Sequence, residues 1–483
     1  MNIYSNRNIT MMMDLYELTM ANGFFLTEDK DRKVAFDVFY RKNPDGGGFS
    51  IFAGLQQVVE YIEGMHFGKE DIDYLRSLHT FDEAFLKYLS EFKFTGDIYA
   101  FPEGTIMYPG EPVITVVAPL AEAQMVETEI LSQVNHQSLI ATKARRIVKS
   151  AGGRAVSDFG ARRAHNNDAA IYGARAAYIG GVNGTATVSA GQYFNIPVGG
   201  TMAHSFVMFY NDELTAFRKF ASVYPDNCIL LADTYDVLHQ GVPDAIKVFE
   251  EMREKGVKSR NYGIRIDSGD LAYLTRKARK MLDEAGFEDA KIVISNSLDE
   301  YTIKSILDQG GCVDSFGVGE RLITSKSEPV FGAVYKLCAV EEDGRMSPRI
   351  KISDTPEKIT NPGLKSVYRI YDQSGHAVAD LIAGADEKVD MSKPYRFVDP
   401  EKPWKNRSFT GYTMKPLQKL IVSGGRRICD LPDTRDIAKY VNDQLQNEIW
   451  DTEQRFENPH KHYIDMSPDY YELKMSMLYE KQH

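Results

Sequence analysis

The chain has 483 residues, a hydrophobic fraction of 43% and a formal net charge of −11 at pH 7. This length allows several domains, and this apolar content is enough for a large buried core. The negative charge argues against nucleic acid or an anionic membrane surface as the main partner, because both attract a net basic face.

Four cysteines, Cys228, Cys312, Cys338 and Cys429, are far apart and form no Cys-x-x-Cys pair. Neither a disulfide framework nor a metal clip is expected from this spacing. The N-terminus does not begin with a basic stretch followed by an apolar one, and no run of about 18 apolar residues occurs. We therefore expect a cytoplasmic protein without a membrane partner.

Residues 1–130 predict the N-terminal part of a mixed α/β domain. The expected elements are a helix at 11–25, a strand at 34–40, mostly helix at 54–93 and short antiparallel strands at 96–117. Tyr16 lies in the first helix, where packing at a domain edge is its simplest role. Arg41 stands beside a glycine-rich loop, which can hold a phosphate or form an ordinary solvated turn.

Helical pattern follows over 121–150, and from Arg154 short apolar runs alternate with helical patterns. This alternation predicts a parallel sheet. The expected strands are 155–158, 185–188, 200–204, 228–233, 262–267, 292–296 and 315–319. The expected helices are 162–179, 212–223, 243–255, 271–285 and 299–307. Such a succession fits an irregular parallel β/α barrel over 131–330.

Other nucleotide-binding folds are disfavoured by the glycine patterns. No Gly-x-Gly-x-x-Gly motif follows the first barrel strand, and the phosphate-binding loop Gly-x-x-x-x-Gly-Lys-Ser/Thr is absent. Beyond residue 330, a strand at 333–340 and a hairpin of 367–371 with 377–383 predict a C-terminal part. We expect this part, 331–483, to return and pack on the N-terminal domain.

Polar residues mark the carboxyl ends of five expected strands: Asp158, His204, Asp233, Asp267 and Asn296. Barrels and open parallel sheets bind their ligands at this edge. The pattern therefore predicts an active site. Considered alone, His204 is equally well explained as a core histidine that is satisfied by a neighbour.

Five segments occur in the order and spacing found in nicotinate phosphoribosyltransferases: Asp14-Leu15-Tyr16, Ser157–Arg163, Gly200–Ser205, Arg265–Leu271 and Val334–Leu337. The chain resembles this family over nearly its whole length. The resemblance implies an irregular α/β barrel joined to a mixed α/β domain made from both termini, assembled as a homodimer with shared active sites.

The same resemblance implies an ATP-coupled, ligase-type enzyme with Mg²⁺ as cofactor. The expected reaction joins nicotinate to phosphoribosyl pyrophosphate and releases pyrophosphate. It is coupled to ATP hydrolysis through a phosphorylated histidine. This is the first step of NAD salvage from nicotinate.

Catalytic and base-binding roles are also implied by the resemblance. His204 matches the phosphohistidine, and Asp233 matches the carboxylate that hydrogen-bonds to it. Arg265 matches an arginine over the pyridine ring and its carboxylate. Asp267 matches an acid that holds ribose hydroxyls or Mg²⁺. Because Arg265 and Asp267 are two residues apart on one expected strand, their side chains face the same way.

The remaining implied roles concern the ring and the phosphates. Phe159 and Tyr16 match two aromatic faces that sandwich the ring, with Tyr16 supplied by the partner subunit, and Thr201 matches a nicotinate contact. The residues matched to phosphate binding are Gly317 and Gly319, with Arg41, Lys143 and Arg162 as further cations.

Two alternatives stay open from the sequence. Nicotinamide phosphoribosyltransferases share the barrel and the histidine, but they carry an aspartate where this chain has Ala186. A catalytically silent relative that serves as a metabolite-binding or scaffold dimer is the other alternative. The presence of His204, Asp233, Arg265 and Asp267 disfavours it.

Overall fold

The computed structural model describes residues 7–390, 392–399 and 404–480. The chain forms two compact units, one built from Met1–Leu139 with Val330–His483 and the other from Ile140–Pro329. The expected fold, an irregular parallel β/α barrel and a mixed α/β domain from both termini, is confirmed. No helix in these described ranges is both long enough and apolar enough to cross a membrane.

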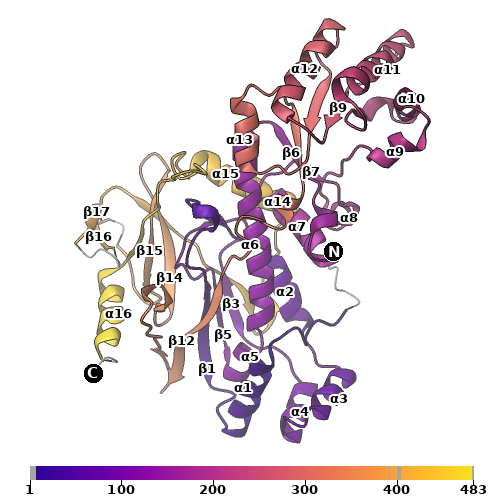
Figure 1. Cartoon of the computed structure of the whole chain (residues 1–483). Helices are drawn as coiled ribbons and strands as arrows, with labels where there is room; N and C mark the ends of the chain where they lie inside the picture. The colour runs from indigo at the N-terminus through magenta and orange to yellow at the C-terminus, as the bar shows by residue number, and fades with distance from the viewer. Residues whose placement is uncertain (1–6, 391, 400–403, 481–483) are drawn as a thin grey trace. The chain divides into compact units, whose positions relative to one another are not determined.

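The first unit contains two larger sheets flanked by helices (Figure 1). Its helices are α1 (Leu15–Leu26), α2 (Leu55–Gly64), α3 (Lys69–Ser77), α4 (Glu83–Ser90), α5 (Leu120–Gln124), α15 (Thr434–Asn447) and α16 (Pro468–Glu480). Helix α6 (Glu127–Ser150) begins in this unit and ends in the second.

A seven-stranded sheet has the order β13-β12-β1-β5-β3-β19-β20, and the pairs formed by β1 with β12 and with β5 are antiparallel. Its strands are β1 (Lys33–Phe39), β3 (Asp97–Ala100), β5 (Ile114–Pro119), β12 (Val334–Glu342), β13 (Arg345–Pro348), β19 (Lys419–Ser423) and β20 (Arg426–Arg427). Strands from both ends of the chain thus share one sheet, over a core of buried apolar side chains.

A six-stranded sheet has the order β17-β16-β21-β15-β14-β18. Its strands are β14 (Lys365–Tyr371), β15 (Ala377–Gly384), β16 (Tyr395–Val398), β17 (Asn406–Phe409), β18 (Thr413–Pro416) and β21 (Ile464–Met466). The short strands β2 (Ser50–Ile51) and β4 (Ile106–Met107) form a separate pair. The β14–β15 pair is the hairpin that the sequence predicts.

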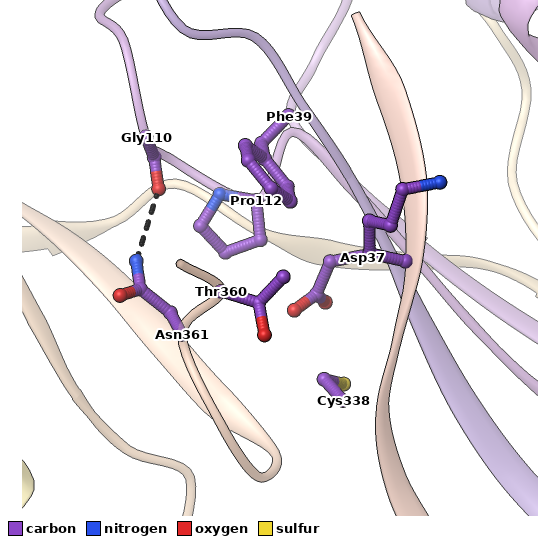
Figure 2. A pocket seen from close by; sticks show the side chains of 8 residues that line it. Asp37, Phe39, Gly110, Pro112, Cys338, Thr360 and Asn361 are labelled. Atoms are coloured by element: carbon purple, nitrogen blue, oxygen red, sulfur yellow. Dashed lines mark hydrogen bonds between the residues drawn. The ribbon is translucent and has the colours of Figure 1, made fainter. Parts of the chain in front are cut away.

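Two buried ion pairs lie in the first unit. Arg369 and Asp380, which are 1% and 0% exposed, form a two-pronged ion pair with nitrogen–oxygen distances of 2.9 and 2.7 Å. Asp37 on β1 is paired with Lys365 on β14. Figure 2 shows a small cavity into which Asp37 points, where Asn361 donates a hydrogen bond to the carbonyl of Gly110 at 3.4 Å.

The second unit contains a parallel sheet of order β7-β6-β11-β10-β9-β8. Its strands are β6 (Ala155–Asp158), β7 (Gly184–Thr185), β8 (Cys228–Leu231), β9 (Tyr262–Ile266), β10 (Lys291–Ile294) and β11 (Ser315–Val318). Its helices are α7 (Asn167–Ile179), α8 (Val188–Phe194), α9 (His204–Phe209), α10 (Glu213–Val223), α11 (Val242–Glu254), α12 (Leu271–Glu284), α13 (Glu300–Asp308) and α14 (Glu320–Ile323).

Local sequence explains these elements. Ile264, Ile294 and Val318 are fully buried, as parallel strands covered on both faces require. Helices α7, α10, α12 and α13 begin after an Asn or Asp whose side chain accepts a hydrogen bond from a backbone N–H of the first turn. Such caps are the preferred helix starts. They explain why the starts predicted for α10, α12 and α13 lie within one residue of the observed ones, whereas α7 begins five residues after its predicted start at Arg162.

The expected strand at 200–204 is wrong. Val198 forms a single parallel bridge with Thr185, and the chain then continues without strand structure until His204 begins α9. Glycine weakens a strand because it has no side chain to pack, and two glycines, Gly199 and Gly200, stand here together. The segment 198–204 nevertheless runs from β7 to the ends of β8 and β9, as its contacts with Thr234 and Arg265 show.

Candidate active site

The carboxyl ends of the parallel strands bring together most of the predicted residues of the second unit. Asp158 ends β6, Asp267 directly follows β9, and Asp233 lies two residues after β8. His204 reaches the same edge from segment 198–204. The shared edge is the one at which parallel sheets place their ligands.

His204 stands between two carboxylates. Its Nε2 lies 3.9 Å from Asp233 Oδ1 and 3.9 Å from Asp267 Oδ2, and its Nδ1 lies 3.1 Å from Thr234 Oγ1. The expected hydrogen bond between His204 and Asp233 is therefore absent, because 3.9 Å is too long. The Thr234 hydroxyl is the hydrogen-bond partner of the ring. The imidazole is 41% exposed, so a ligand can reach it.

Backbone and hydroxyl donors hold the two carboxylates. Asp233 is 1% exposed, and its Oδ2 accepts hydrogen bonds from the Asp267 amide at 3.1 Å and the Ser268 hydroxyl at 2.6 Å. Its Oδ1 is buried without a hydrogen-bond partner among the described residues. Asp267 accepts a hydrogen bond from Ser295, which follows β10. The carboxylates are thus fixed by groups from neighbouring strand ends.

Arg265 links β9 to segment 198–204. Its guanidinium donates to the Thr201 hydroxyl at 2.6 Å and to the Met202 carbonyl at 3.2 Å, and lies 3.7 Å from Asp267 Oδ2. Burial lowers the pKa of Arg265. Its Nε has no hydrogen-bond partner among the described residues. A cation with a donor left over suits the carboxylate of a small acid.

Phe159 packs against Gly317, which lies in β11, and Gly319, which directly follows it. The Arg265 guanidinium lies 5.9 Å from the centre of the Phe159 ring. A Cβ added to Gly317 would lie 2.3 Å from a ring carbon of Phe159, and one added to Gly319 would lie 3.1 Å from the Phe159 carbonyl oxygen. Both glycines therefore leave room for the segment that follows β6.

Side chains after Gly319 and near Phe159 have partners of their own. Glu320 is paired with Lys326 at 2.7 Å, and Arg321 is paired with Asp299. Arg162 is exposed in a short turn after β6, and its charge contributes to the lowered pKa of Arg265. Arg162 is therefore the predicted cation of this unit whose charge acts on Arg265.

Three other predicted residues are Lys143, Tyr16 and Arg41. Lys143 on α6 is 2% exposed, with its amino group 2.9 Å from both carboxylate oxygens of Glu300. Tyr16 and Arg41 belong to the first unit. Tyr16 on α1 is 42% exposed, and the Arg41 guanidinium donates to the Glu357 carbonyl at 2.9 Å. The buried ion pair gives Lys143 a structural role.

The end of β6 is joined to β7 by polar contacts. The Asp158 carboxylate is fully buried and accepts hydrogen bonds from the Thr185 hydroxyl at 2.7 Å and the Gly160 amide at 2.8 Å. Burial raises its pKa. The Ala186 amide donates to the Asp158 carbonyl at 2.8 Å. Asn296 adopts a left-handed φ of 84°, which is uncommon for a residue other than glycine.

Sequence reasoning found the Thr201 hydroxyl but missed three other hydroxyl groups of this site. Thr234 contacts the histidine, Ser268 holds Asp233, and Ser295 holds Asp267. Thr234 and Ser268 each directly follow a predicted aspartate, and Ser295 follows β10. Thr234 and Ser268 could have been predicted from the sequence, because each directly follows an acid at the end of a strand.

No metal cage is preformed in the part of the chain that the structure describes, because no three His, Cys, Asp or Glu side chains are placed to hold an ion. Mg²⁺ does not need such a cage, since it commonly binds one or two carboxylates together with substrate phosphates. Asp267 is 23% exposed and fits that arrangement.

Together, the fold and the site are those of a β/α-barrel protein with a candidate active site at the carboxyl ends of parallel strands, where a histidine is flanked by two carboxylates. Family models of nicotinate phosphoribosyltransferase match three stretches. The N-terminal domain model matches residues 11–135, the family model matches 154–378 and the C-terminal domain model matches 364–474. The chain belongs to the nicotinate phosphoribosyltransferase family, which confirms the resemblance seen in the sequence.

Individual relatives agree with this assignment. The nicotinate phosphoribosyltransferase of Bacillus subtilis is 44% identical over 478 residues, which cover 99% of this chain and 96% of the relative. The crystal structure of human nicotinic acid phosphoribosyltransferase has a TM-score of 0.84 at 27% identity and covers 96% of this chain and 99% of its own. A Pyrococcus furiosus structure described as nicotinate-nucleotide pyrophosphorylase has a TM-score of 0.71 at 25% identity, with 92% and 97% coverage.

Proposed function

We propose that the protein joins nicotinate to phosphoribosyl pyrophosphate, giving nicotinate mononucleotide and pyrophosphate, in the salvage of nicotinate for NAD. Family membership supports the reaction. The arrangement of Arg265 over Phe159 supports nicotinate as the substrate. A flat aromatic acid can stack its face on the Phe159 ring and bind the Arg265 guanidinium with its carboxylate. Incubating the purified protein with nicotinate, phosphoribosyl pyrophosphate, Mg²⁺ and ATP must yield the mononucleotide, and a lack of product overturns the proposal.

The coupling to ATP is proposed to run through His204. When Nδ1 donates its hydrogen to Thr234, Nε2 keeps its lone pair, and the side chain that carries it is 41% exposed. Nε2 then attacks the γ-phosphorus, the bond to the bridging oxygen of ADP breaks, and ADP leaves. Hydrolysis of the phosphohistidine returns the free ring and inorganic phosphate. The proximity of Asp233 and Asp267 offsets the positive charge that the ring gains.

Two variants test this step. His204→Ala is expected to abolish ATPase activity and the incorporation of acid-labile phosphate from γ-labelled ATP. Ribosyl transfer without ATP stimulation should persist at a low rate, because it needs no phosphorylated protein. The matched control is His239→Ala, an exposed histidine of the same unit, which should be labelled like the wild type. Full labelling of His204→Ala would remove His204 from this role.

Mg²⁺ is proposed as the cofactor, held by Asp267 together with substrate phosphates. It would supply charge neutralisation for the departing pyrophosphate. Asp267 would hold the ion in a fixed position, because Ser295 donates a hydrogen bond to its carboxylate. Asp267→Asn should raise the Mg²⁺ concentration needed for half-maximal activity, and an unchanged requirement argues against this ligand.

The active form is proposed to be a cytoplasmic homodimer with shared sites. Leu15, Tyr16 and Met20 on α1 are 56%, 42% and 41% exposed, which is a suitable surface for burial in a partner. Because phosphoribosyl pyrophosphate and ATP are intracellular phosphate compounds, the cytoplasm is the fitting compartment. Mixing Tyr16→Ala subunits with Asp267→Asn subunits should restore activity in heterodimers. No recovery in verified heterodimers means that Tyr16 acts within its own subunit.

A further inference from the structure

Glu213 is a buried acid whose carboxyl oxygens have no hydrogen-bond partner among the described residues. It begins α10 and is 0% exposed. An ionised carboxylate in such surroundings is strongly disfavoured, so the group is held as a neutral acid. The burial, with the charges of Asp244 and Asp233, raises the pKa of Glu213 to about 7.

The surroundings of Glu213 connect it to the nucleophile. Helix α10 packs against α9, α11 and β8. Helix α9 begins with His204, and Asp233 follows β8. Two of the elements packed against α10 therefore carry or precede residues of the candidate active site. Asp233 Oδ1 is the carboxylate oxygen that faces His204 and has no hydrogen-bond partner among the described residues.

Several charged and titratable groups lie on α10 and on the elements packed against it. Helix α11 carries Asp244, Lys247, Glu250, Glu251, Arg253 and Glu254; the others are Arg218 and Lys219 on α10, His204 on α9, Asp233 after β8, the buried thiol of Cys228 on β8 and the exposed Asp226 before β8. Lys247 is paired with Asp244 at 2.9 Å and Arg218 with Glu251 at 2.5 Å, and neither carboxyl oxygen of Glu213 has a hydrogen-bond partner among the described residues. Ionisation of Glu213 therefore adds an uncompensated negative charge beside Asp233.

We propose that Glu213 is a positioning residue for the phosphorylation of His204. The proposal rests on the proposed phosphohistidine. Neutral Glu213 leaves Asp233 and Asp267 as the only negative charges of the cluster that face the ring. When Glu213 loses its proton, the added charge opposes the approach of the anionic γ-phosphoryl group and alters how Asp233 orients the ring. Phosphorylation should thus proceed best while Glu213 keeps its proton.

The test compares how the single-turnover rate of phosphate incorporation from γ-labelled ATP depends on pH in three proteins. Glu213→Gln mimics the neutral acid, and Glu250→Gln makes the same change on the exposed face of α11. Between one pH unit below and one above about 7, the wild-type rate relative to Glu213→Gln should fall, on the order of tenfold. Glu250→Gln should follow the wild type. Parallel profiles for the wild type and Glu213→Gln overturn the proposal.

Infrared difference spectra of the whole protein give a second readout that does not depend on labelling. The protonated carboxyl absorption that disappears as pH rises through about 7 should be smaller in Glu213→Gln than in the wild type by the share of one carboxyl group, with Glu17 among the groups that remain. If the Gln variant does not fold, Glu213→Asp should shift the band and its midpoint, and an unchanged band overturns the proposal. If the wild type takes up no label while the band titrates as expected, the proposed phosphorylation of His204 is refuted, whereas the titration of the buried Glu213 is confirmed.

Discussion

Substitution of Gly317 by alanine tests how the spacing of the base-binding site is set. The new Cβ would lie 2.3 Å and 2.4 Å from two ring carbons of Phe159, whereas ordinary contacts begin at 3.4 Å. The ring must therefore move by about 1 Å or swing aside. Aromatic contacts of this type contribute about 0.5–1.5 kcal/mol, so nicotinate affinity should fall roughly twofold to tenfold.

Steady-state kinetics can separate this effect from damage to the phosphate site. Gly317→Ala should raise KM for nicotinate, with a smaller change in KM for phosphoribosyl pyrophosphate. In a Phe159→Leu background the alanine should have much less effect, because the displaced ring is no longer there. Gly64→Ala, where a Cβ meets nothing within 4 Å, is the matched control. Equal effects of Gly317→Ala in both backgrounds would refute the reasoning.

Further predictions concern stability and substrate choice. Arg369→Met leaves Asp380 buried without its guanidinium and should lower the free energy of unfolding by about 3–5 kcal/mol in urea titrations, whereas Lys69→Met, in an exposed pair, should leave the midpoint unchanged. Glu17 is fully buried and its pKa is raised to about 7 by burial, so its stabilising contribution is complete below its usual pKa of 4.5 and lost as pH rises through 7. Glu17→Gln should therefore be about 1–3 kcal/mol more stable than the wild type at pH 8 and similar at pH 5. Competition kinetics should show nicotinate strongly preferred over nicotinamide, and Ala186→Asp should reduce kcat/KM for nicotinate tens to thousands of fold through roughly 2–5 kcal/mol of charge opposition; better use of nicotinamide by the wild type contradicts this.

The βα alternation could be predicted because buried runs and capped helices are local signals. Cys228–Leu231 reads as a strand from its own residues, and Asp270 marks the start of α12. Segment 200–204 misled the prediction, since its place in the chain fits a strand while its glycines do not support one. The chain order therefore predicted the position of His204 at the site edge but the wrong local conformation.

Contacts between distant residues could not be predicted in the same way. The sequence suggests Lys143 as a phosphate-binding cation, and only the fold shows that it is paired with Glu300. Gly317 suggests a phosphate loop in sequence, and only the fold reveals the Phe159 ring against it. Thr234 was missed because a hydroxyl next to an acid is a common pair, and its contact with His204 depends on where segment 198–204 crosses the strand ends.

That crossing segment has a consequence for hydrogen exchange. In the described structure, the backbone of residues 200–203 forms no hydrogen bond to a neighbouring strand, whereas β6, β9, β10 and β11 are paired on both sides. The amides of 200–203 should therefore exchange with solvent long before those of the paired strands. Arg265 and Thr234 hold the segment through side chains alone, so ligands that engage these two residues can order it without rebuilding the sheet. His204, the proposed nucleophile, thus directly follows a stretch whose order can be coupled to ligand binding.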